Sequence, residues 1–273
     1  MALRERSDRP GAPVRATGTD DAVPALPPAP SLRGATRAAV SDLYFNSWRL
    51  VPANLLWGVG LGLAYLVSLV FWPAALVLAP LLALPTVGIF RIASLAVRGD
   101  SVSFWDGMRA WRQYLVPGLL VGAVTEICGL VLLINLAGGL QSGDLIGWVF
   151  ATLAGWGIVT GWLWLLCFWP LLTDPRREDW GVRRVARASA YLVIAHPLRL
   201  GGLGLVVAVL LAASTVAFAA LISISVAFTG LLACRYVLPA ADRLEARLAA
   251  GGTHLAPSHD MTGDTRAERL PAA

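Results

Sequence analysis

A chain of 273 residues with 57% apolar and only 14% charged side chains is too hydrophobic for an ordinary soluble domain. Charged side chains are absent from residues 50–90, 145–173 and 200–234, and apolar runs longer than about 18 residues predict transmembrane helices. The formal net charge is +5, and the 22 basic residues, all arginine, lie outside these runs, which argues against a nucleic-acid partner. Long continuous runs also argue against a β-barrel, whose strands alternate over short segments.

The arginines predict the topology, because positive residues near a span are retained in the cytoplasm. Arginine is missing between Arg49 and Arg91, over residues 113–175 and over residues 200–234. Each of these stretches should therefore leave the cytoplasm and return. We predict an all-α membrane bundle of six transmembrane helices in three hairpins, with amphipathic cytoplasmic surface helices between them and both termini in the cytoplasm.

Both ends of the chain are predicted to lie outside this bundle. Residues 1–35 are rich in Ala, Pro, Gly, Arg and Thr, and such a composition buries too little apolar surface to fold. We expect disordered cytoplasmic tails over residues 1–35 and 251–273, and one membrane domain over residues 36–250. The first apolar run is too long for a signal peptide, so no cleaved signal is expected.

The first hairpin is predicted over residues 50–90, which provide two spans of about 20 residues each. Its turn should lie near Phe71, Trp72 and Pro73, where two interfacial aromatic residues precede a proline suited to a helix start. An amphipathic stripe ahead of the first span predicts a surface helix that presents Val40, Leu43, Tyr44 and Trp48.

A second surface helix is predicted after the second span. Ser103 and Asp106 have the spacing of a capping box at its start. The apolar residues that recur on one face of this helix are Phe104, Met108, Trp111 and Leu115. The preceding sequence "RGD", residues 98–100, is predicted to be a turn.

The second hairpin is predicted to consist of spans near residues 114–136 and 145–172, joined by a glycine-rich external loop. A third surface helix should follow, with Asp174 as N-cap and Pro175 as its first helical residue. Arg183, Arg184 and Arg187 should lie on the side of this helix that is opposite its apolar face. These arginines predict contact with the lipid bilayer, and with anionic lipids in particular, and docking of a protein partner is the alternative.

The third arginine-free stretch, residues 200–234, admits two interpretations. As one helix it would be about 52 Å long, against a bilayer core of about 30 Å. As two short helices with a break over residues 213–221, it returns Arg235 and the residues after it to the cytoplasm. We predict the two-helix form.

Glu126 is the strongest candidate for a functional residue, because a carboxylate near the centre of a span costs about 2.5–3.5 kcal/mol on insertion scales. In one hypothesis it is protonated and hydrogen-bonded to a neighbouring helix, which locks the packing. In the other it binds a proton or a solute in a transport pathway. Donors available within the spans are Asn54, Thr160, Ser223, Ser225 and the indole N–H of Trp162 or Trp164.

Three more residues are candidates for substrate binding beside Glu126. Asn54 is a polar residue inside the first span, and Trp156 and Trp162 lie deep in the fourth. Tryptophan rings can stack on sugars, although packing or lipid contact is the commoner use. No catalytic motif, histidine cluster or metal-ligand spacing occurs, so we expect neither an enzyme nor a cofactor.

Three segments of the membrane domain form a recognisable pattern: "NLLW" at residues 54–57, "LALPTVGIFRIASLAVRGDSVSFWDGMRAWRQ" at residues 82–113, and "AHPLRL" at residues 195–200. In these segments, most clearly in the first third of the domain, the chain resembles the YesL-like family of bacterial integral membrane proteins. The resemblance extends over most of residues 40–245. His196 departs from it, since the family more often has asparagine before the proline.

This resemblance implies a protein of the bacterial plasma membrane, with no established enzymatic role and an association with carbohydrate uptake. It supplies no site residue. Two hypotheses follow: an accessory or partner of membrane transport machinery such as a sugar-uptake system, or a small-solute transporter or channel that uses Glu126.

Overall fold

The computed structural model describes residues 31–217 and 220–253, and all regular secondary structure within these residues is helical. Six of the helical segments are long and apolar enough to cross a membrane, which agrees with an integral membrane protein of several spans. The predicted all-α helical bundle is therefore confirmed.

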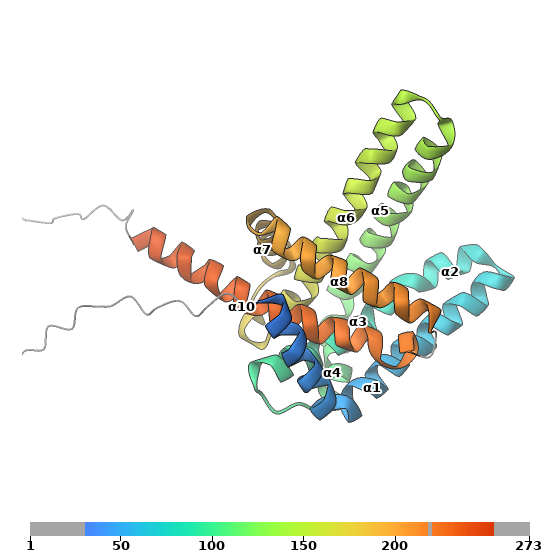
Figure 1. Cartoon of the computed structure of the whole chain (residues 1–273). Helices are drawn as coiled ribbons and strands as arrows, with labels where there is room; N and C mark the ends of the chain where they lie inside the picture. The colour runs from blue at the N-terminus through green and yellow to red at the C-terminus, as the bar shows by residue number, and fades with distance from the viewer. Residues whose placement is uncertain (1–30, 218–219, 254–273) are drawn as a thin grey trace, which may run out of the picture.

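Figure 1 shows the helices in chain order. The first hairpin contains α1 (Leu32–Val70), α2 (Trp72–Leu78), the 3₁₀ helix η1 (Ala79–Leu82) and α3 (Ala83–Arg98), and is followed by α4 (Phe104–Gln113). The second contains α5 (Leu115–Ser142) and α6 (Leu145–Leu172), followed by the 3₁₀ helix η2 (Pro175–Arg177) and by α7 (Val182–Ala195). The third contains α8 (Pro197–Val216), the π-helix η3 (Leu221–Ser225) and α10 (Val226–Thr253).

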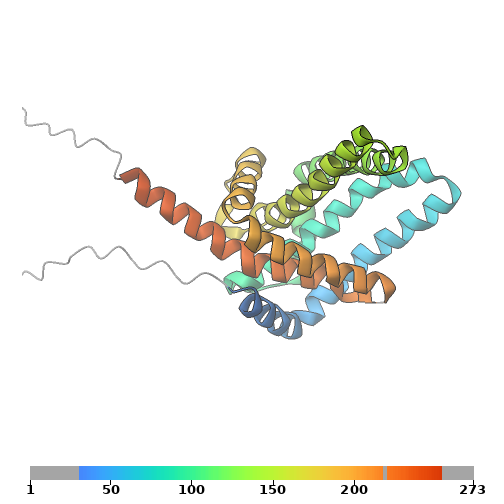
Figure 2. The same ribbon diagram turned by 45° about the horizontal axis from the view of Figure 1, so that its top comes forward.

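The core lies around α10, which packs against α1, α3, α6, α7 and α8. Its first half is almost entirely apolar and buried, with Leu231, Leu232 and Leu238 fully enclosed. The α5–α6 hairpin instead projects away from the other helices in Figure 1, whereas the turned view of Figure 2 foreshortens it. The inner half of that hairpin is therefore held by the core, whereas its outer half exposes most of its apolar surface.

The first hairpin turns at Phe71, as the aromatic-proline pattern predicts. Its predicted surface helix is not separate but forms the first part of α1, where Tyr44 and Trp48 are exposed. Figures 1 and 2 show this dark-blue part at an angle to the rest of α1. Pro52 inside the helix removes a backbone donor, which accounts for a bend without a break.

The surface helix α4 folds as predicted, with a complete capping box between Ser103 and Asp106. Its apolar face packs on α3 and α1, and the crossing with α3 is close because Gly88 meets Gly107. A Cβ on Gly88 would lie 2.5 Å from Trp111 Nε1 and 3.1 Å from the Gly107 carbonyl oxygen. Gly99 ends α3 in the left-handed conformation, so the "RGD" segment is a turn.

The third surface helix differs from its prediction. Asp174 caps only the short helix η2, and α7 begins later, at Val182, without a side-chain cap. Asp174 and Arg177 are held in a buried ion cluster, described below, which fixes this connection as a separate turn. The apolar face of α7 is buried as predicted, and its arginines are exposed.

The third hairpin breaks where predicted: α8 ends at Val216, and helical structure resumes by Leu221. At the chain ends, α1 begins at Leu32 and α10 ends at Thr253. Both helices therefore include a few residues that are predicted to belong to disordered tails. The remainder of the predicted tails, residues 1–30 and 254–273, lies outside the described residues.

The tip of the α5–α6 hairpin offers a matched test of packing. A Cβ on Gly139 would lie 2.3 Å from the Gly147 carbonyl oxygen, whereas a Cβ on Gly138 meets nothing within 4 Å. We expect Gly139→Ala to lower the free energy of unfolding by about 1–3 kcal/mol through overpacking. Gly138→Ala should leave it unchanged or raise it by up to about 1 kcal/mol. Equilibrium unfolding in mixed detergent micelles measures both, and equal effects would contradict the close crossing.

Candidate functional site

Four charged residues meet at one end of the bundle, which we call the arginine-rich end. Arg98, the last residue of α3, donates to Asp174 from Nε at 3.0 Å and from Nη2 at 2.6 Å. It also donates from Nη1 to Asp242 Oδ2 of α10 at 2.6 Å. Arg98 thus joins the first hairpin to the connection after α6 and to α10.

Arg177 completes this ion cluster from the opposite side. It forms an ion pair with Asp174, donates to Asp242 Oδ1 at 2.5 Å, and donates from Nε to Glu245 Oε1 at 2.8 Å. Burial opposes its charge, but the hydrogen bond to Asp242 and the carboxylates of Asp174 and Glu245 raise the pKa of Arg177. The side chains of Asp174, Arg177 and Arg98 are only 0%, 3% and 8% exposed, so these three groups pair away from solvent, whereas Asp242 is 34% exposed.

Further polar contacts extend the same end. Arg91 pairs with Glu178 and donates to the Thr173 carbonyl oxygen at 3.1 Å. Arg235 of α10 donates to both carboxylate oxygens of Asp42 in α1, at 2.5 and 2.7 Å. These groups are therefore used to hold helices together, and Arg91 pairs with Glu178 rather than with Glu126.

Glu126 lies in α5 and is half-buried. Gly122, one turn earlier, faces α3 and η1, where a Cβ would meet the Pro80 carbonyl oxygen at 3.0 Å, and Glu126 lies on the same side of α5. Its Oε2 is buried and has no hydrogen-bond partner among the described residues. Two predicted donors have other acceptors: Trp162 donates to the Gly204 carbonyl oxygen at 3.4 Å, and Trp164 to that of Ala186 at 3.1 Å.

Asn54 is fully buried between α1 and α10. Its Oδ1 accepts a hydrogen bond from the Ala227 N–H at 2.8 Å. Ala227 lies just after the π-helix η3, where the backbone changes from π-helical to α-helical hydrogen bonds. At such a change, some backbone N–H groups have no acceptor within the helix. Ser225 donates to the Ser214 hydroxyl oxygen at 2.6 Å in the same region. Asn54 therefore joins α1 to α10 and stabilises an irregular helix start.

The two tryptophan candidates have different surroundings. Trp156 is 67% exposed on the projecting part of α6. Trp162 is half-buried and lines a groove between α5 and α6 with a volume of about 340 Å³. The floor of this groove includes Gly129, Gly157 and Gly161, and its only polar side-chain lining besides Trp162 and Trp164 comes from Thr125 and Cys128.

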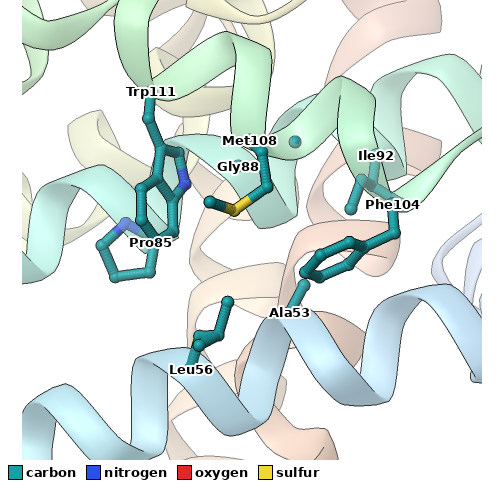
Figure 3. A pocket seen from close by; sticks show the side chains of 9 residues that line it. Ala53, Leu56, Pro85, Gly88, Ile92, Phe104, Met108 and Trp111 are labelled. Atoms are coloured by element: carbon teal, nitrogen blue, oxygen red, sulfur yellow. The ribbon is translucent and has the colours of Figure 1, made fainter.

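Two other hollows are present in the described part of the chain. Figure 3 shows one between α1, α3 and α4, where Phe104, Met108 and Trp111 point toward α1 and α3; its volume of about 10 Å³ leaves no room for a solute. The other is a groove of about 710 Å³ between α7 and α10. Glu126 lines none of these three hollows.

Sequence reasoning missed the ion cluster, because it assigned the arginines to topology and lipid contact. A signal was present, since charged residues follow the second apolar run of each hairpin: Arg98 ends α3, Asp174 follows α6, and Asp242 lies in the second half of α10. Comparison of the chain with protein-family models, with curated proteins and with solved structures finds no match. Within the described residues, no group of three or more His, Cys, Asp or Glu side chains is placed to hold a metal ion.

Asp174→Asn tests the cluster. The substitution keeps the side-chain shape but removes the charge that both buried arginines share. We expect the free energy of unfolding to fall by about 3–5 kcal/mol, the cost of leaving a buried charge uncompensated. The exposed Asp179 of the same connection is the matched control, and Asp179→Asn should change stability by less than about 0.5 kcal/mol. Equal small losses in both variants, measured by denaturant titration in micelles, would contradict the structural role.

Proposed function

We propose that this chain is a non-enzymatic accessory subunit of membrane transport machinery, in which the α5–α6 hairpin docks a transmembrane helix of another protein. The observation that carries the proposal is the exposed groove on this hairpin, floored by Gly129, Gly157 and Gly161. Glycine at a helix surface permits close backbone approach by a neighbouring helix, which is how transmembrane helices associate in lipid. The resemblance to the YesL-like family supports a sugar-uptake system as the partner.

The use of the polar groups supports the same role. The buried ion cluster, the Asp42–Arg235 pair and the Asn54–Ala227 contact all join helices of the chain itself. In the proposed orientation the arginine-rich end faces the cytoplasm of a bacterium, both termini lie there, and exposed arginines contact anionic lipids. No nucleic acid and no cofactor takes part.

A groove-filling substitution tests the docking. A Cβ on Gly161 meets nothing within 4 Å, and Gly161 lines the groove, so Gly161→Leu places a bulky side chain at the groove. Gly155→Leu is the control, because its Cβ position is equally open and lies outside the groove. We expect chemical cross-linking in native membranes to join the parent protein and the Gly155→Leu variant to one transport subunit. The yield of this cross-linked product should be at least tenfold lower for Gly161→Leu. Equal cross-linking in all three, or cross-links to lipid alone, would contradict the proposal.

The second candidate function is solute or proton transport through Glu126. It is favoured by one observation, the buried Oε2 without a hydrogen-bond partner among the described residues. Carboxylates in that state mark transport pathways in other membrane proteins.

Flux through vesicles separates the two functions. We expect vesicles reconstituted with the parent and with Glu126→Gln to show the same proton leak and the same sucrose-driven swelling as protein-free vesicles. Flux in the parent that Glu126→Gln reduces by tenfold or more would replace the accessory role with transport. A pyranine-loaded lumen reports the protons, and light scattering reports the swelling.

A further inference from the structure

The groove between α7 and α10 combines a basic rim with an apolar floor. Arg183, Arg184 and Arg187 line it from α7, and Leu244 and Leu248 line it from α10. Its volume of about 710 Å³ exceeds that of the other two hollows. A ligand that fits this groove needs both negative charge and apolar length.

The arginines of the rim differ from those of the ion cluster. Within residues 31–217 and 220–253, no carboxylate forms an ion pair with Arg183, Arg184 or Arg187. Glu245, the one acidic residue that lines the groove, is engaged by Arg177. The rim therefore keeps a net positive charge. The Arg184 guanidinium lies 4.3 Å from the centre of the Trp180 ring, which holds it at the groove mouth.

The basic rim continues into a stripe of apolar residues. On the exposed face of α7, Arg187 is followed at helical spacing by Tyr191 and Ile194. The helix ends at Ala195, and Leu198 is exposed in the first turn of the next helix, α8. The side chains of Tyr191, Ile194 and Leu198 are 63%, 75% and 90% exposed. Because α8 is one of the six helices apolar enough to cross a membrane, these residues connect the groove with a membrane-spanning helix.

We propose that the α7–α10 groove binds an anionic phospholipid, with its phosphate at Arg184 and Arg187 and an acyl chain along Leu244 and Leu248. Arginine binds phosphate through several N–H donors at once, and the leucines bury apolar chain that an inorganic anion does not have. An acidic protein segment matches the charge, but it does not account for the apolar stripe that leads into the membrane. The inference rests on the membrane location of the chain and not on its accessory role.

The test uses the full-length protein purified in detergent and titrated with phosphatidylglycerol or phosphatidylcholine, with lipid retention measured by native mass spectrometry. The parent should retain phosphatidylglycerol in preference to phosphatidylcholine. Arg184→Gln with Arg187→Gln should weaken phosphatidylglycerol binding by about tenfold or more. The matched control, Arg109→Gln with Arg112→Gln, removes the same charge from exposed positions of α4 and should leave binding unchanged.

The floor is tested separately with Leu248→Asn, at a position that is 67% exposed. This substitution should weaken phosphatidylglycerol binding at least threefold, and all variants should keep the thermal unfolding midpoint of the parent. If the α7 and α4 double variants lose phosphatidylglycerol binding equally, the binding depends on overall charge, and the proposed site is wrong. Binding of polyglutamate that depends on Arg184 and Arg187, with lipid binding unaffected by Leu248→Asn, would assign the groove to an acidic protein instead.

Discussion

A buried charge is costly in a protein interior unless it is paired with an opposite charge. Arg98, Asp174, Arg177 and Asp242 pair with one another, and these pairs join the three hairpins. Each hairpin contributes from the end of its second span or from the connection just after it. Both arginines contact both aspartates, so the loss of one group affects all the others. The cluster thereby fixes which helix ends meet, a choice that apolar packing in lipid leaves weakly specified.

Joining the hairpins at one end leaves them free to diverge at the other. Asp42 with Arg235 and Asn54 with Ala227 hold α1 along α10, so the first and third hairpins stay together over part of their length. The α5–α6 hairpin leaves that pair and projects alone (Figure 1). Its glycine-lined groove is therefore accessible from outside the bundle, and the proposed docking of a partner helix rests on this exposure.

Much of the fold could be predicted from sequence because hydropathy, arginine spacing and capping are local signals. The turn at Phe71 and the capping box at Ser103 follow from a few neighbouring residues, and the break after Val216 follows from the length of the arginine-free stretch. The ion cluster could not be predicted in the same way, since Arg98 pairs with Asp242, which is 144 positions later in the sequence. The surroundings of Glu126 were equally inaccessible, because they depend on how α5 meets α3 and η1, not on the residues beside it in the chain.

The same limitation explains why arginines alike in sequence serve different purposes. A rule that counts positive residues near spans treats Arg98 and Arg184 alike. In the fold, Arg98 is buried against two carboxylates, so its charge is neutralised within the protein and contributes little to an external anion. Arg184 is exposed, lies over Trp180 and faces a groove whose acidic residue is already paired. Only arginines of the second kind are available to an external anion, so burial and pairing, rather than number, determine where the proposed lipid site can lie.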